Sequence, residues 1–226
     1  MTEQAVVLLS GGLDSATALY VAVKEYGLKC HCVTFYYGQK NQREMDAARE
    51  IATAGFSTSL EHIHIKLSYM ADLKSSALTN WEIPVPSVVK VLGHPQPPTY
   101  VPFRNMLFLT IGAQIAEDIG AEKVFYGAHQ TDMHGYFDAT FEFVGRFNSV
   151  LRLNRLHKIQ VYAPLINMTK AEIVQKGSRL GVPFHLTYSC YEGKEFHCGR
   201  CATCAERMKA FQDAGVEDPT RYLAGV

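Results

Sequence analysis

The chain has 226 residues and carries 22 Lys and Arg against 22 Asp and Glu, so its formal net charge is zero with histidine neutral. Hydrophobic residues make up 47% of the chain and charged residues 19%, which is the composition of an ordinary globular protein. General nucleic-acid and anionic-membrane binders usually show a basic excess, so neither class is favoured. The longest apolar run, 106–116, is far shorter than the ~20 residues of a membrane-spanning helix. No signal peptide is recognisable, and we expect a soluble cytoplasmic protein.

Strand-like and helix-like segments alternate along the chain. The pattern of apolar residues predicts strands at 5–9, 30–36, 60–65, 123–127 and 159–163. It predicts helices at 14–26, 43–54, 104–119 and 169–180, each followed by a glycine. The last of these has Thr169 as its N-cap and Glu172 as its capping-box partner. This alternation predicts an α/β fold, a Rossmann-like parallel sheet with helices on both faces.

Two stretches interrupt the alternation. Residues 75–102 hold six of the nine prolines, and we expect a long irregular loop of the kind that serves as a lid or mobile segment. Residues 188–204 are too polar and too rich in cysteine to form a core element.

The most informative local motif is SGGLDS at residues 10–15, between the first predicted strand and the first predicted helix. Paired glycines allow a tight turn, and a helix N-terminus presents several N–H groups to an anion. Ser10 and Ser15 add hydroxyl groups. The loop is not a Walker A motif, because no lysine occurs before Lys24. A plain strand-to-helix turn capped by serine is the alternative.

SGGLDS resembles the pyrophosphate loop of the N-type ATP pyrophosphatases, which hold the β- and γ-phosphates of ATP and let a nucleophile attack the α-phosphorus. The resemblance implies that the loop binds ATP and Mg²⁺ through Ser10, Gly11, Gly12, Leu13, Asp14 and Ser15. The later segment TKAEI at 169–173 resembles a second motif of this superfamily, whose lysine, here Lys170, faces the phosphates. An ordinary capping box is the alternative for this segment.

Four of the six cysteines lie within fifteen residues, in the pattern Cys190-x7-Cys198-x2-Cys201-x2-Cys204. In an intracellular chain such a cluster is typical of metal ligands rather than disulfides. Four thiolates suit tetrahedral zinc and leave no position for water, so we expect a structural zinc ion. An iron–sulfur cluster is the alternative, because spacing alone does not select the metal. We therefore divide the chain into an ATP pyrophosphatase-like domain, 1–187, and an appendage with the zinc site and a C-terminal helix, 188–226.

Further segments narrow the family. They are VTFYYGQ at 33–39, SALT at 76–79, YVPFRN at 100–105 and the stretch 127–138. Together with SGGLDS and the cysteine cluster, they resemble the 7-cyano-7-deazaguanine synthase (QueC) family over nearly the whole chain and in the same order. Members of that family are typically homodimers. They convert 7-carboxy-7-deazaguanine, ammonia and ATP to the nitrile preQ0, a precursor of modified bases in tRNA.

The resemblance also implies roles for individual residues. The residues expected to act in catalysis are Asp14, Ser15, Arg104 and Lys170. The residues expected to bind the substrate are Arg104, Asn105, Asp132, Tyr136 and Asp138. For the two aspartates the expected partner is the guanine-like edge, because a carboxylate accepts hydrogen bonds from the ring N–H and the amino group. An exposed helix-starting charge is the alternative for Arg104, and solvated loop carboxylates are the alternative for the aspartates.

The chain departs from the family pattern on the presumed substrate side. The family usually reads E-T-D-x-S-G-Y-P-D-C-R, whereas this chain has QTDMHGYFDAT at 130–140. The family arginine is replaced by Thr140, which removes a cation that could pair with an anionic group. The nucleotide loop is intact, so ATP use is better supported than the identity of the acceptor or product, and nitrile, amide and larger conjugate all remain open.

Three other functions stay open. One is a QueC-like enzyme that passes the activated carboxylate to another amine, such as one on a partner protein in antiviral defence. A second is a tRNA-thiolating enzyme of the same superfamily, for which only Cys30 and Cys32 could serve as catalytic cysteines near the ATP site. A third is a non-enzymatic zinc-ribbon module, against which the intact SGGLDS loop argues.

Overall fold

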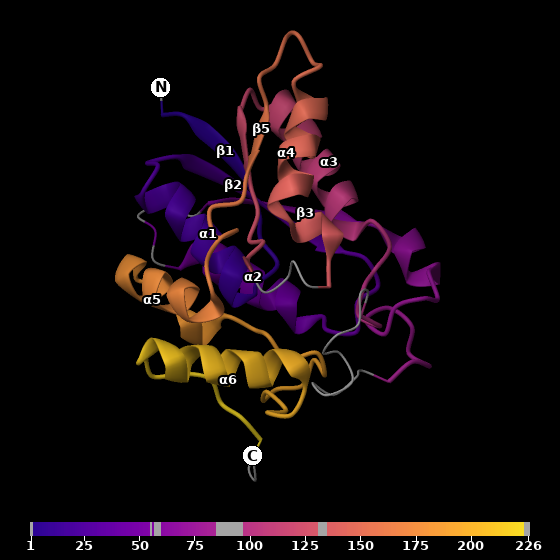
Figure 1. Cartoon of the computed structure of the whole chain (residues 1–226), viewed down its shortest axis with the longest axis vertical. Coiled ribbons are helices and arrows are strands. Elements are labelled where there is room, and N and C mark those ends of the chain that lie inside the picture. Colours follow the sequence, from indigo (N-terminus) through magenta and orange to yellow (C-terminus); the bar gives the residue numbers. More distant parts are fainter. Residues whose placement is uncertain (1, 55, 57–59, 85–96, 131–134, 224–226) are drawn as a thin grey trace.

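The computed structural model describes residues 2–54, 56, 60–84, 97–130 and 135–223 (Figure 1). The strands are β1 (Gln4–Leu8), β2 (Lys29–Tyr36), β3 (Glu61–Lys66), β4 (Lys123–Phe125) and β5 (Gln160–Tyr162). The α-helices are α1 (Leu13–Lys24), α2 (Arg43–Thr53), α3 (Arg104–Asp118), α4 (Phe141–Leu151), α5 (Lys170–Leu180) and α6 (Ala202–Ala214). All strand pairings are parallel, in the order β3-β2-β1-β4-β5.

Helices cover both faces of the sheet, as the sequence predicts. Val7 on β1 packs in a core with residues of α1, α2 and α5, whereas its neighbour Val6 packs in a second core with residues of α3 and α4. Both valines are fully buried. The continuous apolar run of β1 therefore reflects burial on both faces, as in other parallel sheets. No helix within the described ranges has the length and apolar character needed to cross a membrane.

The strand order reverses between β1 and β4, which places a topological switch point there. The chain builds β1, β2 and β3 outward in one direction, then returns through α3 to add β4 on the other side of β1. At such a point the connections leave the strand ends in opposite directions and open a crevice, where ligands of open α/β sheets bind. Gly127, just past β4, lies against the start of α1, because a Cβ there would be 2.8 Å from the backbone of Asp14 and Ser15.

Local signals account for most of the predicted elements. Thr169 and Glu172 form the capping box predicted for α5, and Gly181 ends that helix in the left-handed conformation. The structure adds α4, a helix that the sequence pattern does not predict, since Gly145 weakens helix propensity. It is stabilised by the N-cap Thr140, whose hydroxyl accepts a hydrogen bond from the backbone N–H of Phe143.

The C-terminal helix α6 packs beside α5 at one end of the molecule (Figure 1). Its Arg207 is only 1% exposed. The guanidinium donates hydrogen bonds to the Asp218 carboxylate, to the Thr187 and Ser189 hydroxyls, and to the Phe184 carbonyl. Burial acts to raise the pKa of Asp218, but Arg207 and the local hydrogen bonds hold that pKa below its ordinary value. One buried cation thus joins α6 to the segments before and after it.

Replacing Arg207 with Met should lower the free energy of unfolding by about 3 kcal/mol, since it leaves the partly buried Asp218 carboxylate without its cation. Lys209→Met, on the same helix in an exposed ion pair with Asp213, should change it by less than about 0.5 kcal/mol. Urea denaturation measures both. The contribution of Asp218 is present above the ordinary aspartate pKa and is lost as the pH falls through its lower folded value. The two variants should therefore become more alike in acid, and equal losses at neutral pH would contradict this assignment.

Candidate active site and metal centre

The SGGLDS loop is a closed hydrogen-bonded turn between β1 and α1. The Ser15 hydroxyl lies 2.9 Å from the Ser10 hydroxyl, accepts the Ser10 N–H and donates to the Gly12 carbonyl. Gly12 is the N-cap of α1 but has no side chain to cap it. The first N–H groups of α1 are thereby left for an external acceptor, which is the arrangement found at anion-binding helix N-termini.

Gly11 packs with no room for a side chain. Its φ of +86° lies in the left-handed region that favours glycine. A Cβ there would be 2.2 Å from the carbonyl oxygen of Glu44 and 2.9 Å from the nitrogen of Ala48, so the first turn of α2 rests directly on the loop. The carbonyl of Gly11 accepts the N–H of Tyr188, from the segment that leads to the cysteines. Three segments distant in sequence therefore meet at this glycine.

Asp14 and Lys170 form an ion pair at the start of α1. The Lys170 ammonium lies 2.7 Å from Asp14 Oδ2 and 2.8 Å from Nε2 of His129, a residue that is only 2% exposed. Burial acts to raise the pKa of Asp14, but the Lys170 ammonium and its hydrogen bond, with His129 beside them, outweigh burial and keep that pKa below its ordinary value. The ammonium also lies 3.7 Å from Glu206 on α6. Asp14 is therefore ionised at neutral pH, and its other oxygen, Oδ1, has no partner within the described residues.

A cavity of about 280 Å³ opens at the carboxyl ends of β1, β2 and β4. Its floor includes Ser10, Asp14 and Ser15 of the loop. Its other polar lining residues are Thr34, Tyr37, Gln39, Lys40, Asn41, Glu44, Arg104, Asn105, Tyr126, Tyr136 and Tyr191. The phosphate loop and most of the predicted substrate side of the protein thus share one cavity.

Arg104 enters this cavity from the first residue of α3. It follows Phe103, whose φ of +51° is unusual for a residue other than glycine. The guanidinium donates to the Tyr37 hydroxyl at 3.0 Å and lies over the Tyr37 ring. Burial acts to lower the pKa of Arg104, but the neighbouring tyrosines and Asp138 hold that pKa above its ordinary value. Arg104 therefore presents a fixed positive charge to the cavity.

Four of the five predicted substrate residues lie in the described part of the chain, and three of them line the cavity. These are Arg104, Asn105 and Tyr136. Asp138 is 1% exposed, lies outside the lining, and accepts the backbone N–H of Asn105, so its carboxylate fixes the start of α3. Asp132 lies outside the described residues. In the phosphate loop, the Leu13 side chain is buried in the core, which leaves only its backbone for a ligand.

Several residues of the cavity and of the Lys170 contacts had no distinguishing signal in the sequence. His129 is a single histidine after a strand, and Glu206 lies on a mixed polar helix. Asn41 and Glu44 lie at the start of α2, which sequence alone indicates only as a helix N-terminus. Tyr191 stands among the cysteines. Each is brought to the cavity or to Lys170 by tertiary packing.

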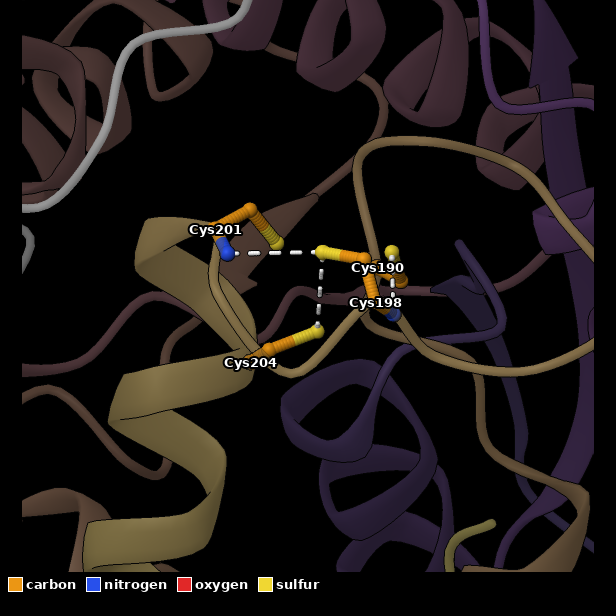
Figure 2. A group of neighbouring side chains, drawn as sticks. All are labelled: Cys190, Cys198, Cys201 and Cys204. Atoms are coloured by element: carbon orange, nitrogen blue, oxygen red, sulfur yellow. Dashed lines mark hydrogen bonds between the residues drawn. The ribbon is translucent and has the colours of Figure 1, made fainter. Parts of the chain in front are cut away.

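The four clustered cysteines form one buried group (Figure 2). Their Sγ atoms all lie within 4.8 Å of one another, and those of Cys198 and Cys204 are 4.0 Å apart. Thiolates bound to tetrahedral zinc at ~2.3 Å would be about 3.8 Å apart, so the group fits one ion. Backbone N–H groups donate to the sulfurs of Cys190 and Cys198, which favours the thiolate form. Cys201 is the N-cap of α6, and Cys204 lies in its first turn.

The cysteine segment also forms part of the cavity. It contributes Tyr191 to the lining, and its Gly193 lies close to Lys40 and Asn41, where a Cβ would be 3.2 Å from the Lys40 carbonyl oxygen. Together with the hydrogen bond from Tyr188 to Gly11, these contacts make the segment a wall of the site. A metal ion that fixes this segment would therefore fix the phosphate loop as well.

Comparison with known proteins places the whole chain in one family. A family model described as "Queuosine biosynthesis protein QueC" matches residues 4–215. The chain belongs to the QueC family. This result confirms the predicted resemblance, and with it an ATP-dependent ligase-type enzyme of α/β fold.

Individual relatives are similar in sequence to this chain along nearly their full length. The 7-cyano-7-deazaguanine synthase of Oceanobacillus iheyensis is 39% identical over 223 residues, which cover 98% of this chain and 99% of the relative. That of Archaeoglobus fulgidus is 42% identical over 217 residues, covering 96% and 89%. Among solved structures, a predicted subunit of tRNA methyltransferase from Methanocaldococcus jannaschii aligns with a TM-score of 0.50 at 17% identity, covering 98% of this chain and 92% of that one. At this identity the last similarity concerns the fold alone.

We expect the purified protein to contain one zinc ion per chain, and Cys198→Ser to lose it. Because metal binding at a structural site contributes to folding, this variant should be less stable by about 3 kcal/mol, or roughly 10 °C in melting temperature. Elemental analysis and thermal unfolding measure the two effects. Arg200→Gln, exposed within the same turn, should retain both metal and stability. A chain without metal, or one with a coloured iron centre, would rule out the zinc assignment.

Proposed function

We propose that the protein is a 7-cyano-7-deazaguanine synthase, which uses ATP to convert 7-carboxy-7-deazaguanine and ammonia to the nitrile. The observation that carries the proposal is that Asp14 of the SGGLDS loop, ion-paired with Lys170, lines one cavity with Arg104 and Asn105, inside a chain of this family. The cysteine appendage, 188–226, is proposed to hold structural zinc, and the domain 1–187 to hold the substrates.

The proposed roles follow from charge and position. The N–H groups at the start of α1 and the hydroxyls of Ser10 and Ser15 would bind the β- and γ-phosphates. Lys170 would leave Asp14 in part to neutralise phosphate oxygens. Arg104, fixed by Tyr37, would stabilise the negative charge that develops at the α-phosphorus when the substrate carboxylate attacks. ATP would be cleaved there, giving an acyl adenylate and pyrophosphate.

Asp14 also suits Mg²⁺. Its Oδ1 has no partner within the described residues, while Lys170 keeps the group ionised. Magnesium in phosphoryl-transfer sites binds one or two carboxylates together with phosphate oxygens, and it neutralises the charge of the leaving pyrophosphate. Asp14 would hold the ion in this way, and the protein would supply positioning and charge stabilisation for the rest of the reaction.

The overall chemistry explains the need for two rounds of activation. A carboxylate is a poor acceptor for ammonia, because its leaving group would be an oxide. Adenylation supplies AMP as the leaving group, and ammonia displaces it to give the amide. A second ATP adenylates the amide oxygen, and loss of AMP and a proton leaves the nitrile. The same loop and the same cavity would serve both rounds.

A second candidate function differs from the first in the amine that accepts the activated acyl group. Ala139 lines the cavity and Thr140 caps α4, at positions where the family usually has cysteine and arginine. These substitutions beside the cavity favour an enzyme that transfers the activated acyl group to another amine, for example on a partner protein. Thiolation of tRNA is disfavoured, because Cys30 and Cys32 are buried in β2 and burial raises the pKa of both thiols. The homodimer implied by the family resemblance and the cytoplasmic location expected from the sequence remain predictions.

Turnover should release AMP and pyrophosphate, and Asp14→Ala and Ser15→Ala should each lower it by roughly tenfold or more, since each removes a group from the phosphate site. Chromatography of the nucleotide products and a pyrophosphate assay measure this. Asp46→Asn, an exposed aspartate on α2, is the matched control and should keep full activity. ADP as the sole nucleotide product would exclude the mechanism.

The acceptor is tested by mass spectrometry of products from 7-carboxy-7-deazaguanine, ATP, Mg²⁺ and ammonia. Synthase activity predicts conversion to the nitrile with two ATP consumed per product. Adenylation needs only the phosphate loop and a placed carboxylate, whereas nitrile formation also needs the amide to rebind with its oxygen towards ATP. Accumulation of adenylate or amide would instead support the second candidate, with a different amine as the acceptor.

A further inference from the structure

Two polar residues of the cavity have no role in the function proposed above. Asn41 and Glu44 lie three residues apart, at the turn before α2 and in its first turn, and both line the cavity. Asn41 is only 5% exposed, yet among the described residues neither its amide oxygen nor its amide nitrogen has a partner at hydrogen-bonding geometry. Buried amides in folded proteins are nearly always paired, so an orphaned one that faces a cavity points to a ligand.

Glu44 is the acidic group of the cavity that remains available. The described lining contains two carboxylates, and the other, Asp14, is engaged by Lys170. The Glu44 carboxyl lies near the Asn41 amide, the Arg104 guanidinium and the Tyr191 hydroxyl. Burial raises the pKa of Glu44 to about 7, while the Arg104 charge and the adjacent Asn41 side chain oppose the rise. Hydrogen bonds donated by a ligand would favour the ionised form of such a group.

The backbone holds this pair rigidly beside the phosphate loop. The carbonyl of Glu44 lies against Gly11, and the backbone of Asn41 lies against Gly193 of the cysteine segment. The preceding turn is fixed by Gln39, whose side chain accepts the Tyr37 N–H and donates to the Phe35 carbonyl. The position of Asn41 and Glu44 relative to the phosphate loop is therefore fixed by packed backbone.

We propose that Asn41 and Glu44 bind the pyrimidinone edge of the deazaguanine substrate. The amide N–H₂ of Asn41 would donate to the ring carbonyl, and the carboxylate of Glu44 would accept from the ring N–H and the exocyclic amino group. The protein thus offers one donor and two acceptors. They match the one acceptor and two donors that this edge of the base presents. The inference rests on the proposed function and assigns to Glu44 the contact that the sequence predicts for Asp132 and Asp138.

The same pair disfavours the adenine of ATP at this position. Adenine presents an acceptor at the ring nitrogen next to its amino group, and a carboxylate offers no donor to it. A carboxylate facing that nitrogen would be repelled and left without a donor, which is how a site rejects a competing base. The pair thus separates the two purine-like ligands that must occupy one cavity.

The test compares 7-carboxy-7-deazaguanine with an analogue that lacks the 2-amino group. The analogue removes the donor assigned to Glu44, and Glu44→Gln removes one acceptor without changing the size of the side chain. Substrate-dependent pyrophosphate exchange gives kcat/KM for adenylation, and calorimetry with a non-hydrolysable ATP analogue gives the affinity of each base directly. Glu50→Gln, exposed on the same helix, is the matched control.

The wild type should lose about 100-fold in kcat/KM with the analogue, and Glu44→Gln about 100-fold with the parent base. The two losses should not multiply, because they remove the same contact. Asn41→Asp should lower kcat/KM equally for both bases, since both keep the ring carbonyl. The KM for ATP should change less than twofold in every variant, and Glu50→Gln should behave as the wild type.

Three results would overturn the assignment. If Glu44→Gln and the missing amino group lower kcat/KM by factors that multiply, the amino group does not contact Glu44. A large rise in the KM for ATP would assign the pair to adenine. Unchanged binding of the parent base by both variants would remove the pair from the site. A wild-type protein that binds no deazaguanine carboxylate at all would refute the proposed function itself, which is a different outcome.

Discussion

The contact at Gly11 is the constraint on which the site depends. Its backbone meets the first turn of α2 so closely that a side chain would overlap the Glu44 carbonyl, and its own carbonyl binds the N–H of Tyr188. The left-handed φ at this residue makes such an approach possible at little conformational cost. The phosphate loop, the start of α2 and the cysteine segment therefore have fixed positions relative to one another, although more than 170 residues separate the first from the last.

This arrangement gives the cysteine cluster a part in the active site as well as in stability. The segment around the four sulfurs supplies Tyr191 to the cavity, and α6, which begins at the cluster, brings Glu206 to within 3.7 Å of the Lys170 ammonium. Arg207 on the same helix holds the chain on either side of the cluster. A metal ion at the cysteine cluster can thus influence the shape of a site that it does not touch, because the backbone that connects the two is tightly packed.

The buried charged and polar groups of the chain differ in whether they have partners inside the protein. Within the described residues, buried charges such as Arg207 and Asp14 have partners of opposite sign, as the cost of desolvation requires. The side-chain amide of Asn41 is different, because it lines the cavity with no hydrogen-bond partner among the described residues. Because an unpaired buried amide is energetically costly, a ligand that supplied its missing partners would gain affinity and specificity from this residue.

The sequence by itself determined most of the helices and strands, the SGGLDS loop, the cysteine cluster and the family, because these signals depend on neighbouring residues and on spacing along the chain. The capping box at Thr169 and the strand before Ser10 are of this kind. Only the tertiary structure decided the strand order, the existence of α4, the burial of Asp138 outside the cavity, and the meeting of Asn41, Glu44 and Tyr191 within it. The physical reason is that burial and unused hydrogen-bonding capacity arise from contacts between segments far apart in the chain, and local sequence patterns do not contain them.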